Sequence, residues 1–213
     1  MKLVLISDTH GNHNFKIPEG DVLIHAGDVS LRGTKTEVDE FIKWFQKQPH
    51  KHKIFIAGNH DFYFEEAVKN NIKLEYPNLI YLNDSGCEID GINFWGSPIQ
   101  PTFFDWAFNR KRGEEIKKHW DLIPEKTDVL ITHGPPYKVL DLTNNGEQVG
   151  CKELKKKVLE VKPKLHVFGH IHEDYGKTTQ NETIFINASL LDEKYRCIKK
   201  PVEIELFDEK INP

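Results

Sequence analysis

The chain has 213 residues, a formal net charge of −4 and a hydrophobic fraction of 38%. The hydrophobic fraction excludes a disordered chain, and the length suits one folded unit, so we predict a single domain over residues 1–213. The acidic balance excludes the strongly basic surface of a protein that wraps long nucleic acid. We therefore expect small substrates and no extended nucleic-acid groove.

Cysteine usage and the first residues bear on the cellular location. The three cysteines are an odd number without a CxxC pair, which is typical of reduced thiols in a cytosolic protein. The opening apolar run, KLVLI, is too short for the core of a signal peptide or for a membrane span. We expect a cytoplasmic protein with no membrane partner, and the sequence leaves the oligomeric state open.

Apolar runs of strand length alternate with segments of helical periodicity, which indicates βα units around a buried sheet. The predicted central strands are Leu3–Ile6, Val22–Ile24, Ile54–Ala57, Val129–Ile131 and Leu165–Phe168. Between the second and third strands, Thr34 and Glu37 have the spacing of a capping box, and apolar residues follow at helical intervals. A second helix is predicted for about residues 150–161.

The middle and the end of the chain have shorter patterns. The segment GCEIDGINFWGS (86–97) is two short runs around Asp90 and Gly91, which predicts a hairpin. The segments TTQNETIFINAS (178–189) and PVEIELFD (201–208) have the character of short antiparallel strands. Together these elements predict an α/β protein with two packed sheets and helices on the outside.

Polar side chains follow each of the five central strands, at the edge where ligands bind in open α/β sheets. Seven of them are candidate metal ligands: Asp8, His10, Asp28, Asn59, His133, His170 and His172. Imidazole and carboxylate without cysteine suit divalent cations, and seven groups exceed what one ion needs. Each residue alone could be a turn residue or a structural histidine. Their agreement at five strand ends favours a centre of two metals, which can act on a phosphoryl group.

Other histidines have simpler interpretations. His25 and His166 lie within strands, where we expect hydrogen-bonded core side chains. His50, His52 and His119 lie in charged stretches, where we expect surface side chains.

The motifs DTH (8–10), GD (27–28), GNHD (58–61), the histidine at 133 and GHIH (169–172) resemble those of the calcineurin-like metallophosphoesterases. The segments GSPIQPTFFDWAFNRKRG (96–113), THGPP (132–136) and VGCKEL (149–154) are similar to the metallophosphoesterase-domain-containing, or class III cyclic-nucleotide-phosphodiesterase-like, subfamily. The resemblance implies a four-layer α/β/β/α sandwich with two packed mixed sheets, the metallophosphoesterase fold.

The resemblance also implies roles for the strand-end residues. The first metal would be held by Asp8, His10, Asp28 and His172. The second would be held by Asn59, His133, His170 and a bridging Asp28. His60 would stabilise charge on the phosphate or protonate the leaving oxygen, and Asp61 would orient the His60 ring. Some relatives lose the histidine at the position of His170 and become feeble enzymes, so its presence argues for activity.

These expectations define a hydrolase hypothesis. We predict a phosphodiesterase that acts on small phosphodiesters such as cyclic nucleotides, through a hydroxide that bridges two divalent metal ions. Manganese is the first choice of metal, and iron, zinc, cobalt or nickel also suit these ligands. The alternatives are a phosphomonoesterase or nuclease on the same centre, or a weakly active nucleotide-binding or scaffold protein.

The segment 103–108 carries four aromatic rings that either stack on a substrate base or anchor the loop to the core. Packing is the favoured interpretation for most of these rings. Asn109, Arg110 and Arg112 follow directly, and we predict them as substrate-binding residues near the phosphate.

Overall fold

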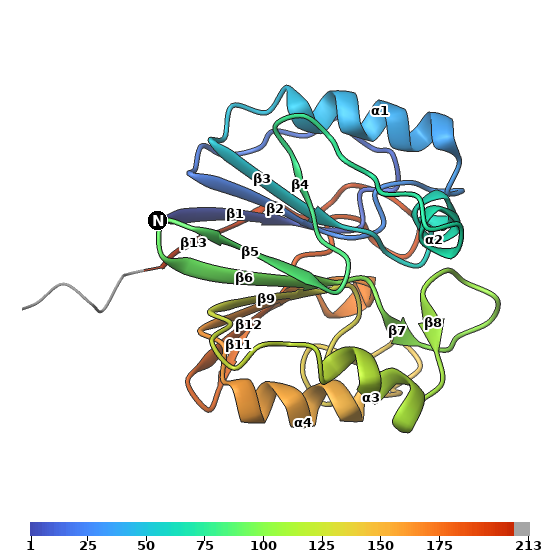
Figure 1. Cartoon of the computed structure of the whole chain (residues 1–213), viewed down its shortest axis with the longest axis vertical. Helices are drawn as coiled ribbons and strands as arrows, with labels where there is room; N and C mark the ends of the chain where they lie inside the picture. Colours follow the sequence, from blue (N-terminus) through green and yellow to red (C-terminus); the bar gives the residue numbers. More distant parts are fainter. Residues whose placement is uncertain (207–213) are drawn as a thin grey trace, which may run out of the picture.

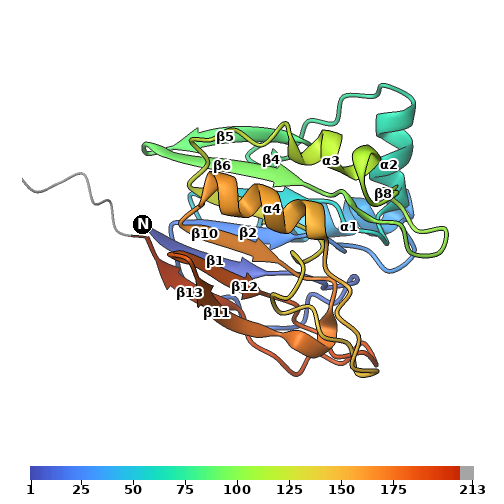
Figure 2. The same cartoon turned by 90° about the horizontal axis from the view of Figure 1, so that it is seen from below.

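Two β-sheets pack face to face, and helices cover their outer faces (Figure 1). This computed structural model describes residues 1–206, so the last seven residues of the predicted domain and the end of the segment 201–208 lie outside the described part. Helix α1 (Lys35–Gln46) covers one outer face, and α3 (Glu114–Trp120) and α4 (Lys152–Val161) cover the other (Figures 1 and 2). The predicted four-layer sandwich of two mixed sheets is confirmed.

The first sheet has the strand order β13-β1-β2-β3-β4. Its strands are β1 (Lys2–Ile6), β2 (Val22–Ala26), β3 (His52–Ile56), β4 (Ile80–Tyr81) and β13 (Val202–Glu205). The second sheet has the order β11-β12-β10-β9-β6-β5. Its strands are β5 (Ser85–Ile89), β6 (Ile92–Ser97), β9 (Val129–Thr132), β10 (Leu165–Phe168), β11 (Gly176–Gln180) and β12 (Thr183–Asn187). A short separate pair joins β7 (Gln100–Pro101) to β8 (Asn109–Arg110).

The near-continuous apolar runs follow from burial of the central strands on both faces. In β1, Leu3 and Leu5 belong to the core between the two sheets, whereas Val4 and Ile6 pack on the side of α1. Because side chains alternate along a strand, a strand covered on both sides must be apolar at every position. This explains why these strands were predictable without any alternation in hydropathy.

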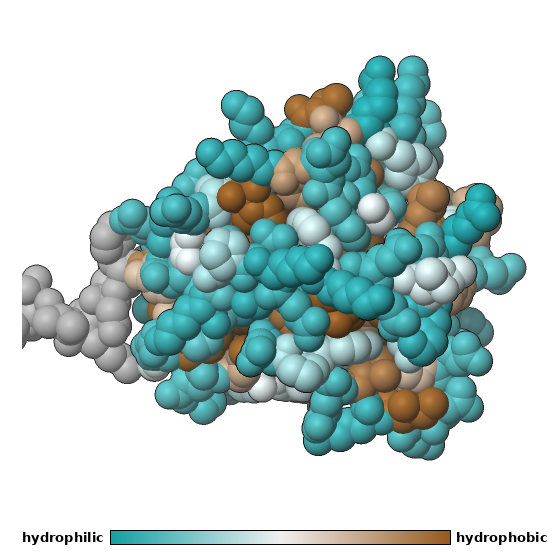
Figure 3. Space-filling model, turned by 90° about the horizontal axis from the view of Figure 1, so that it is seen from above, coloured by the Kyte–Doolittle hydropathy of each residue, from teal (hydrophilic) through white to brown (hydrophobic). Residues whose placement is uncertain are grey.

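Helix α1 begins where the capping box predicts. The Thr34 hydroxyl accepts a hydrogen bond from the Glu37 backbone N–H, and the Glu37 carboxylate accepts one from the Thr34 N–H at 3.0 Å. These bonds satisfy backbone donors that the first helical turn leaves free. The inner face of α1 buries Val38, Phe41 and Phe45 against the first sheet. Its outer side is mainly hydrophilic, with separate hydrophobic patches (Figure 3).

The strand directions bring the loops after the central strands to one edge. Strands β1, β2 and β3 are parallel to one another, and so are β6, β9, β10 and β12. The predicted hairpin of β5 and β6 is confirmed, with Asp90 and Gly91 both at positive φ. Strand β12 is antiparallel to β11, as predicted, but it also pairs in parallel with β10. Strand β13 is antiparallel to β1.

The histidines outside the predicted metal site divide into confirmed and wrong predictions. His25 and His166 are fully buried, and each shares a 2.9 Å hydrogen bond with a threonine hydroxyl. The prediction for His50 is wrong: it is only 3% exposed, because its Nε2 bonds the Pro18 carbonyl at 3.0 Å. The charged neighbours of His50 in the sequence do not report this contact, since it comes from a loop about thirty residues away.

Two further predictions concern the whole chain. The three cysteines are free thiols, as their odd number predicts. Among residues 1–206, none of the helices has the length and the apolar character that a membrane crossing requires.

Candidate metal centre

The seven predicted metal ligands converge at one edge of the two sheets. Asp8 and His10 follow β1, Asp28 follows β2, Asn59 follows β3, His133 follows β9, and His170 and His172 follow β10. Three clusters have potential ligand atoms within 4.8 Å of one another: Asp8, His10 and His172; His10, Asp28 and His60; Asp8, Asp28 and His133. Asp8, His10 and Asp28 each belong to two clusters, so the three clusters overlap and form one centre.

The first half of the centre joins β1 to β10. His172 Nε2 lies 3.3 Å from His10 Nε2 and 3.3 Å from an Asp8 carboxylate oxygen. On the other side of its ring, His172 Nδ1 donates a hydrogen bond to the Asp192 carbonyl at 3.0 Å. This bond fixes the ring so that Nε2 faces the centre, which is how second contacts orient metal-binding histidines.

The second half of the centre joins β2, β3 and β9. His133 Nδ1 donates to the Ala26 carbonyl at 3.0 Å, so its Nε2 faces the centre. There it lies 2.8 Å from the Asn59 side-chain oxygen and 3.4 Å from an Asp28 carboxylate oxygen. In each half, imidazole nitrogens and carboxylate or amide oxygens thus converge on one place. This donor set fits divalent cations.

His170 has a different place from the other six. Its backbone N–H donates to the Asp8 carboxylate at 3.0 and 3.1 Å, and its ring centroid lies 5.0 Å from that of His133. Its ring is not part of the three clusters. The structure therefore places His170 beside the second half, and its role as a metal ligand stays a prediction.

The carboxylates and histidines of the centre shift one another's pKa values. Burial alone would raise the pKa of Asp8 and Asp28, but the adjacent histidines keep both well below their usual value. Conversely, burial alone would lower the pKa of His133 and of His172. Asp28 instead raises the pKa of His133 to about 9, and Asp8 raises that of His172 to about 9. In the protein without metal, His133 and His172 therefore carry protons that a cation must displace.

The backbone at the centre is strained and closely packed. Asp8, His10, Asp28 and His170 all have φ between 45° and 69°, a region that side chains other than glycine rarely occupy. The glycine of GHIH permits this geometry, because a Cβ at Gly169 would overlap the Asp8 carboxylate. Such strain persists only where the surroundings hold it, and it concentrates here on the predicted ligands.

His60 lies at the centre, but Asp61 does not orient it. His60 Nδ1 donates to the Leu31 carbonyl at 2.7 Å, which turns its Nε2 toward His10 and Asp28. The Asp61 carboxylate instead accepts hydrogen bonds from the backbone N–H groups of residues 29, 30 and 58 and from the Ser30 hydroxyl. Burial and the nearby Asp28 raise the Asp61 pKa to about 6. The predicted Asp61–His60 contact is wrong, because Asp61 holds the neighbouring loops together.

The predicted substrate-binding residues are engaged elsewhere. Asn109 donates to the carbonyls of residues 103 and 104, and Arg110 Nε donates to His119 at 3.1 Å. Arg112 donates to the carbonyls of Val149 and Gly150. None of the three lines the cavity over the centre. Spacing placed them near the phosphate, but their side chains serve the loops that carry them.

The aromatic segment divides between packing and the site. Phe108 is buried, as expected for an anchor, whereas Phe103 and Phe104 are 55% and 74% exposed. Trp106 stacks on His60 with ring centroids 4.2 Å apart. Tyr195 was missed by sequence reasoning: it lies edge-on to His10 at 4.8 Å, and the surrounding DEKYR carries no signal for this position.

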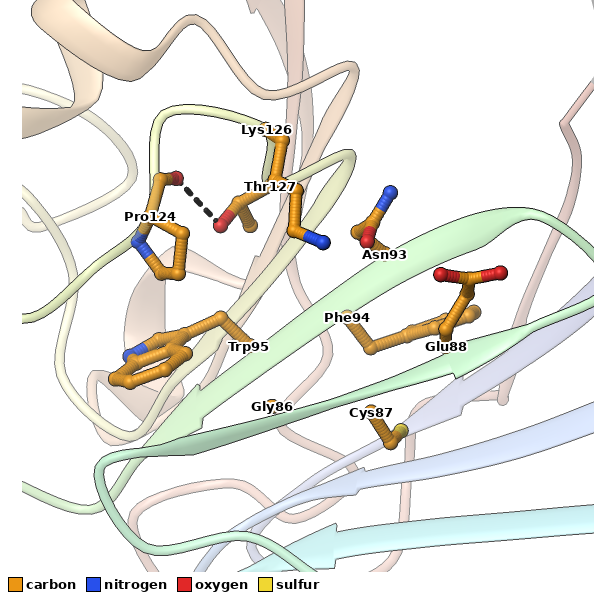
Figure 4. A pocket seen from close by; sticks show the side chains of 9 residues that line it. All are labelled: Gly86, Cys87, Glu88, Asn93, Phe94, Trp95, Pro124, Lys126 and Thr127. Carbon is orange, nitrogen blue, oxygen red and sulfur yellow. Dashed lines mark hydrogen bonds between the residues drawn. The ribbon is translucent and has the colours of Figure 1, made fainter.

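Two cavities differ in their position relative to the metal centre. One of about 240 Å³ lies over the centre, where Asp28, His60 and His172 meet Trp106 and Tyr195. Another of about 340 Å³ lies over the β5–β6 hairpin and is lined by none of the predicted metal ligands (Figure 4). Five of the predicted site residues line the first cavity: Asp28, Asn59, His60, His170 and His172.

Comparison with known proteins agrees with this geometry. Residues 1–174 match the family model described as calcineurin-like phosphoesterase. The chain belongs to this family. It is 40% identical to human metallophosphoesterase domain-containing protein 1 over 96% of this chain and 71% of the relative. A UPF0046 protein of Caenorhabditis elegans is also 40% identical, over all of this chain and 82% of the relative.

Solved structures share the fold of this calcineurin-like phosphoesterase. One crystal structure superposes with a TM-score of 0.65 at 16% identity and covers 87% of this chain and 89% of its own. A second, described as GAP50, the anchor in the inner membrane complex of Plasmodium, has a TM-score of 0.52 at 12% identity. It covers 89% of this chain and 71% of its own. Family membership and the clustered ligands identify a metal-dependent phosphoesterase with a dinuclear centre.

Proposed function

We propose that this phosphoesterase is a phosphodiesterase of small phosphodiesters such as cyclic nucleotides. The observation that carries the proposal is the convergence of oriented imidazole nitrogens and the carboxylates of Asp8 and Asp28 beneath one small cavity. A cavity of about 240 Å³ is of a size that suits a small ester. The acidic side chains of Glu173 and Glu193 at its border also disfavour a nucleic acid.

We assign one cation to each half of the centre. The proposed residues of the first site are Asp8, His10, Asp28 and His172. The proposed residues of the second site are Asp28, Asn59, His133 and His170. When bound, the cations supply Lewis acidity toward the phosphate and lower the pKa of a bound water. Manganese is the first candidate, and iron, zinc, cobalt or nickel suit the same donors.

The side chains around the centre supply the rest of the chemistry. His60, fixed by the Leu31 carbonyl, has its Nε2 available for a phosphoryl oxygen or for the oxygen of the leaving group. Trp106 covers one face of the His60 ring and Tyr195 stands edge-on to His10, so the two aromatic rings limit water around the phosphate. The three free thiols support a reducing, cytoplasmic setting for this activity.

The test is a comparison of substrates on protein reconstituted with each metal. Metal-depleted protein receives Mn²⁺, Fe²⁺, Co²⁺, Ni²⁺ or Zn²⁺, and its bound metal is measured. We expect hydrolysis of bis(p-nitrophenyl) phosphate and of 2′,3′- or 3′,5′-cyclic nucleotides in preference to p-nitrophenyl phosphate. A preference for the monoester would replace the proposal with a phosphomonoesterase. Bound metal without any hydrolysis would leave a binding or scaffold protein.

A further inference from the structure

A larger cavity adjoins the cavity over the metal centre. This side cavity has a volume of about 380 Å³ and lies between β7, the loop 143–149 and the turn after β10. Phe103, His170 and Glu173 line both cavities. A molecule held at the centre can therefore extend past these three residues without leaving the protein surface.

The charge of the side cavity is acidic. Glu147 and Glu173 line it, and Glu193 borders the adjoining cavity over the centre. Arg112 is the one cationic side chain along the side cavity, and its two terminal nitrogens donate to the Gly150 and Val149 carbonyls. None of the three glutamates forms an ion pair within 4 Å among residues 1–206, and the cation that feels the charge of both Glu173 and Glu193 is Lys199. This region repels a second anionic group and favours a positive one.

Aromatic surface accompanies these carboxylates. Phe103 lines both cavities and keeps more than half of its surface exposed, although its ring also pairs with that of Phe104. Trp106 and Tyr195 line the adjoining cavity over the centre. Aromatic faces next to carboxylates attract ammonium groups through the ring quadrupole, most strongly where water is excluded. The same faces tolerate the methyl groups of a quaternary ammonium.

We propose that the preferred substrate is a phosphodiester with one ammonium-bearing arm, and that this arm lies in the side cavity against Glu173, Glu147 and Phe103. The inference rests on the proposed phosphodiesterase function. In the reaction, a water oxygen forms a bond to phosphorus and the bond to the other ester arm breaks. That arm leaves with the electron pair and takes up a proton that the attacking water has lost, and the ammonium arm remains on the phosphate as a monoester.

Three diesters with one leaving group test the charge of the arm. Each carries p-nitrophenol, and the second arm is choline, its uncharged isostere 3,3-dimethylbutanol, or an anionic 3-carboxypropanol. We expect kcat/KM to be about tenfold higher for the choline ester than for the isostere, and lowest for the carboxylate. A general attraction of anions to the metal centre would give the opposite order. Added salt should reduce the preference, because it screens solvent-exposed charges such as those of Glu147 and Glu173.

Variants place the preference in the side cavity. Glu173→Gln and Glu147→Gln should each lower the ratio of choline ester to isostere several-fold, whereas Glu182→Gln, on the exposed β11–β12 turn, should leave it unchanged. Equal kcat/KM for the two esters overturns the proposal. So does a preference that survives both substitutions at the cavity.

Calorimetry separates this inference from the proposed function. Binding of the choline ester and of its isostere is measured on metal-depleted protein, where no turnover occurs. Suppose that the choline ester binds more tightly but the metal-loaded protein hydrolyses no diester. This result would refute the phosphodiesterase function and support binding of the ammonium arm in the side cavity. Equal binding of the two esters, together with hydrolysis of bis(p-nitrophenyl) phosphate, would refute binding of the ammonium arm in the side cavity and support the phosphodiesterase function.

Discussion

The metal centre and its rim are built in different ways. The residues of the centre lie within a few positions of the ends of parallel strands, and Asp8, Asp28 and His133 there are at most 2% exposed. The rim comes from the segments 102–108 and 192–196, where Phe104 and Tyr195 are 74% and 46% exposed. The strand directions alone bring the centre together, whereas the rim depends on contacts between distant loops. We therefore expect substitutions at the centre to be far more costly for hydrolysis.

The largest effect is expected at the shared carboxylate and at the buried histidine of the second half. Asp28→Ala and His133→Ala should each lower metal-stimulated hydrolysis by about a thousandfold or more, because they remove groups that hold the cations. Elemental analysis should show less bound metal in both. Asp39→Ala and His52→Ala, which change the same residue types outside the centre, serve as controls. Near-normal turnover in either centre variant would contradict the proposed ligand set.

The next effect concerns His60, which lies between the centre and the rim. His60→Gln should lower kcat by about a hundredfold with bound metal retained, since it removes a donor to the phosphoryl or leaving oxygen. Kinetics and metal content are measured on the same preparation. A loss of one metal per chain would show instead that His60 Nε2 is a ligand, which its place in the cluster with His10 and Asp28 allows.

The difference between the strand-end centre and the loop-built rim also explains which features the sequence could predict. The five central strands and the place of all seven strand-end side chains were predicted because apolar runs fix these strands and parallel strands share one edge. The two-residue strands β4, β7 and β8 were not predicted, since they have no such run. The orientation of His60 was not, since the Leu31 carbonyl that holds it belongs to a loop 29 residues away. The same holds for Arg110, whose partner His119 lies on α3. Hydrogen bonds between loops follow from the final packing and leave no periodicity in the sequence.

A pH effect follows from the proton content of the centre. The pKa values of His133 and His172 are raised to about 9 in the metal-free fold, against an ordinary value of 6.5. Their contribution to metal-free stability is therefore complete below pH 6.5 and lost as pH rises through 9. A cation replaces these protons, so its affinity should rise by up to about tenfold per pH unit for each proton displaced.

Thermal melts measure this effect at pH 6.5, 7.5 and 8.5 with and without Mn²⁺. The increase in Tm on adding Mn²⁺ should grow with pH, and a competition titration should show the matching rise in affinity. The variant His119→Gln is the control, because its partners Asp84 and Arg110 lie outside the centre. A metal-induced Tm increase that stays constant across this range would contradict the protonation of His133 and His172.

The smallest effect is expected at the rim. Trp106→Leu removes the ring stacked on His60, and an aromatic pair contributes about 0.5–1.5 kcal/mol beyond its burial. We therefore expect a change in kcat/KM of about twofold to tenfold, with bound metal unchanged. Phe104→Leu is the matched control, because its ring pairs with Phe103 and does not reach the centre. If Trp106→Leu lowered hydrolysis as severely as His60→Gln, the rim would have to be counted as part of the centre, since His60 would then depend on Trp106 more than on the Leu31 carbonyl.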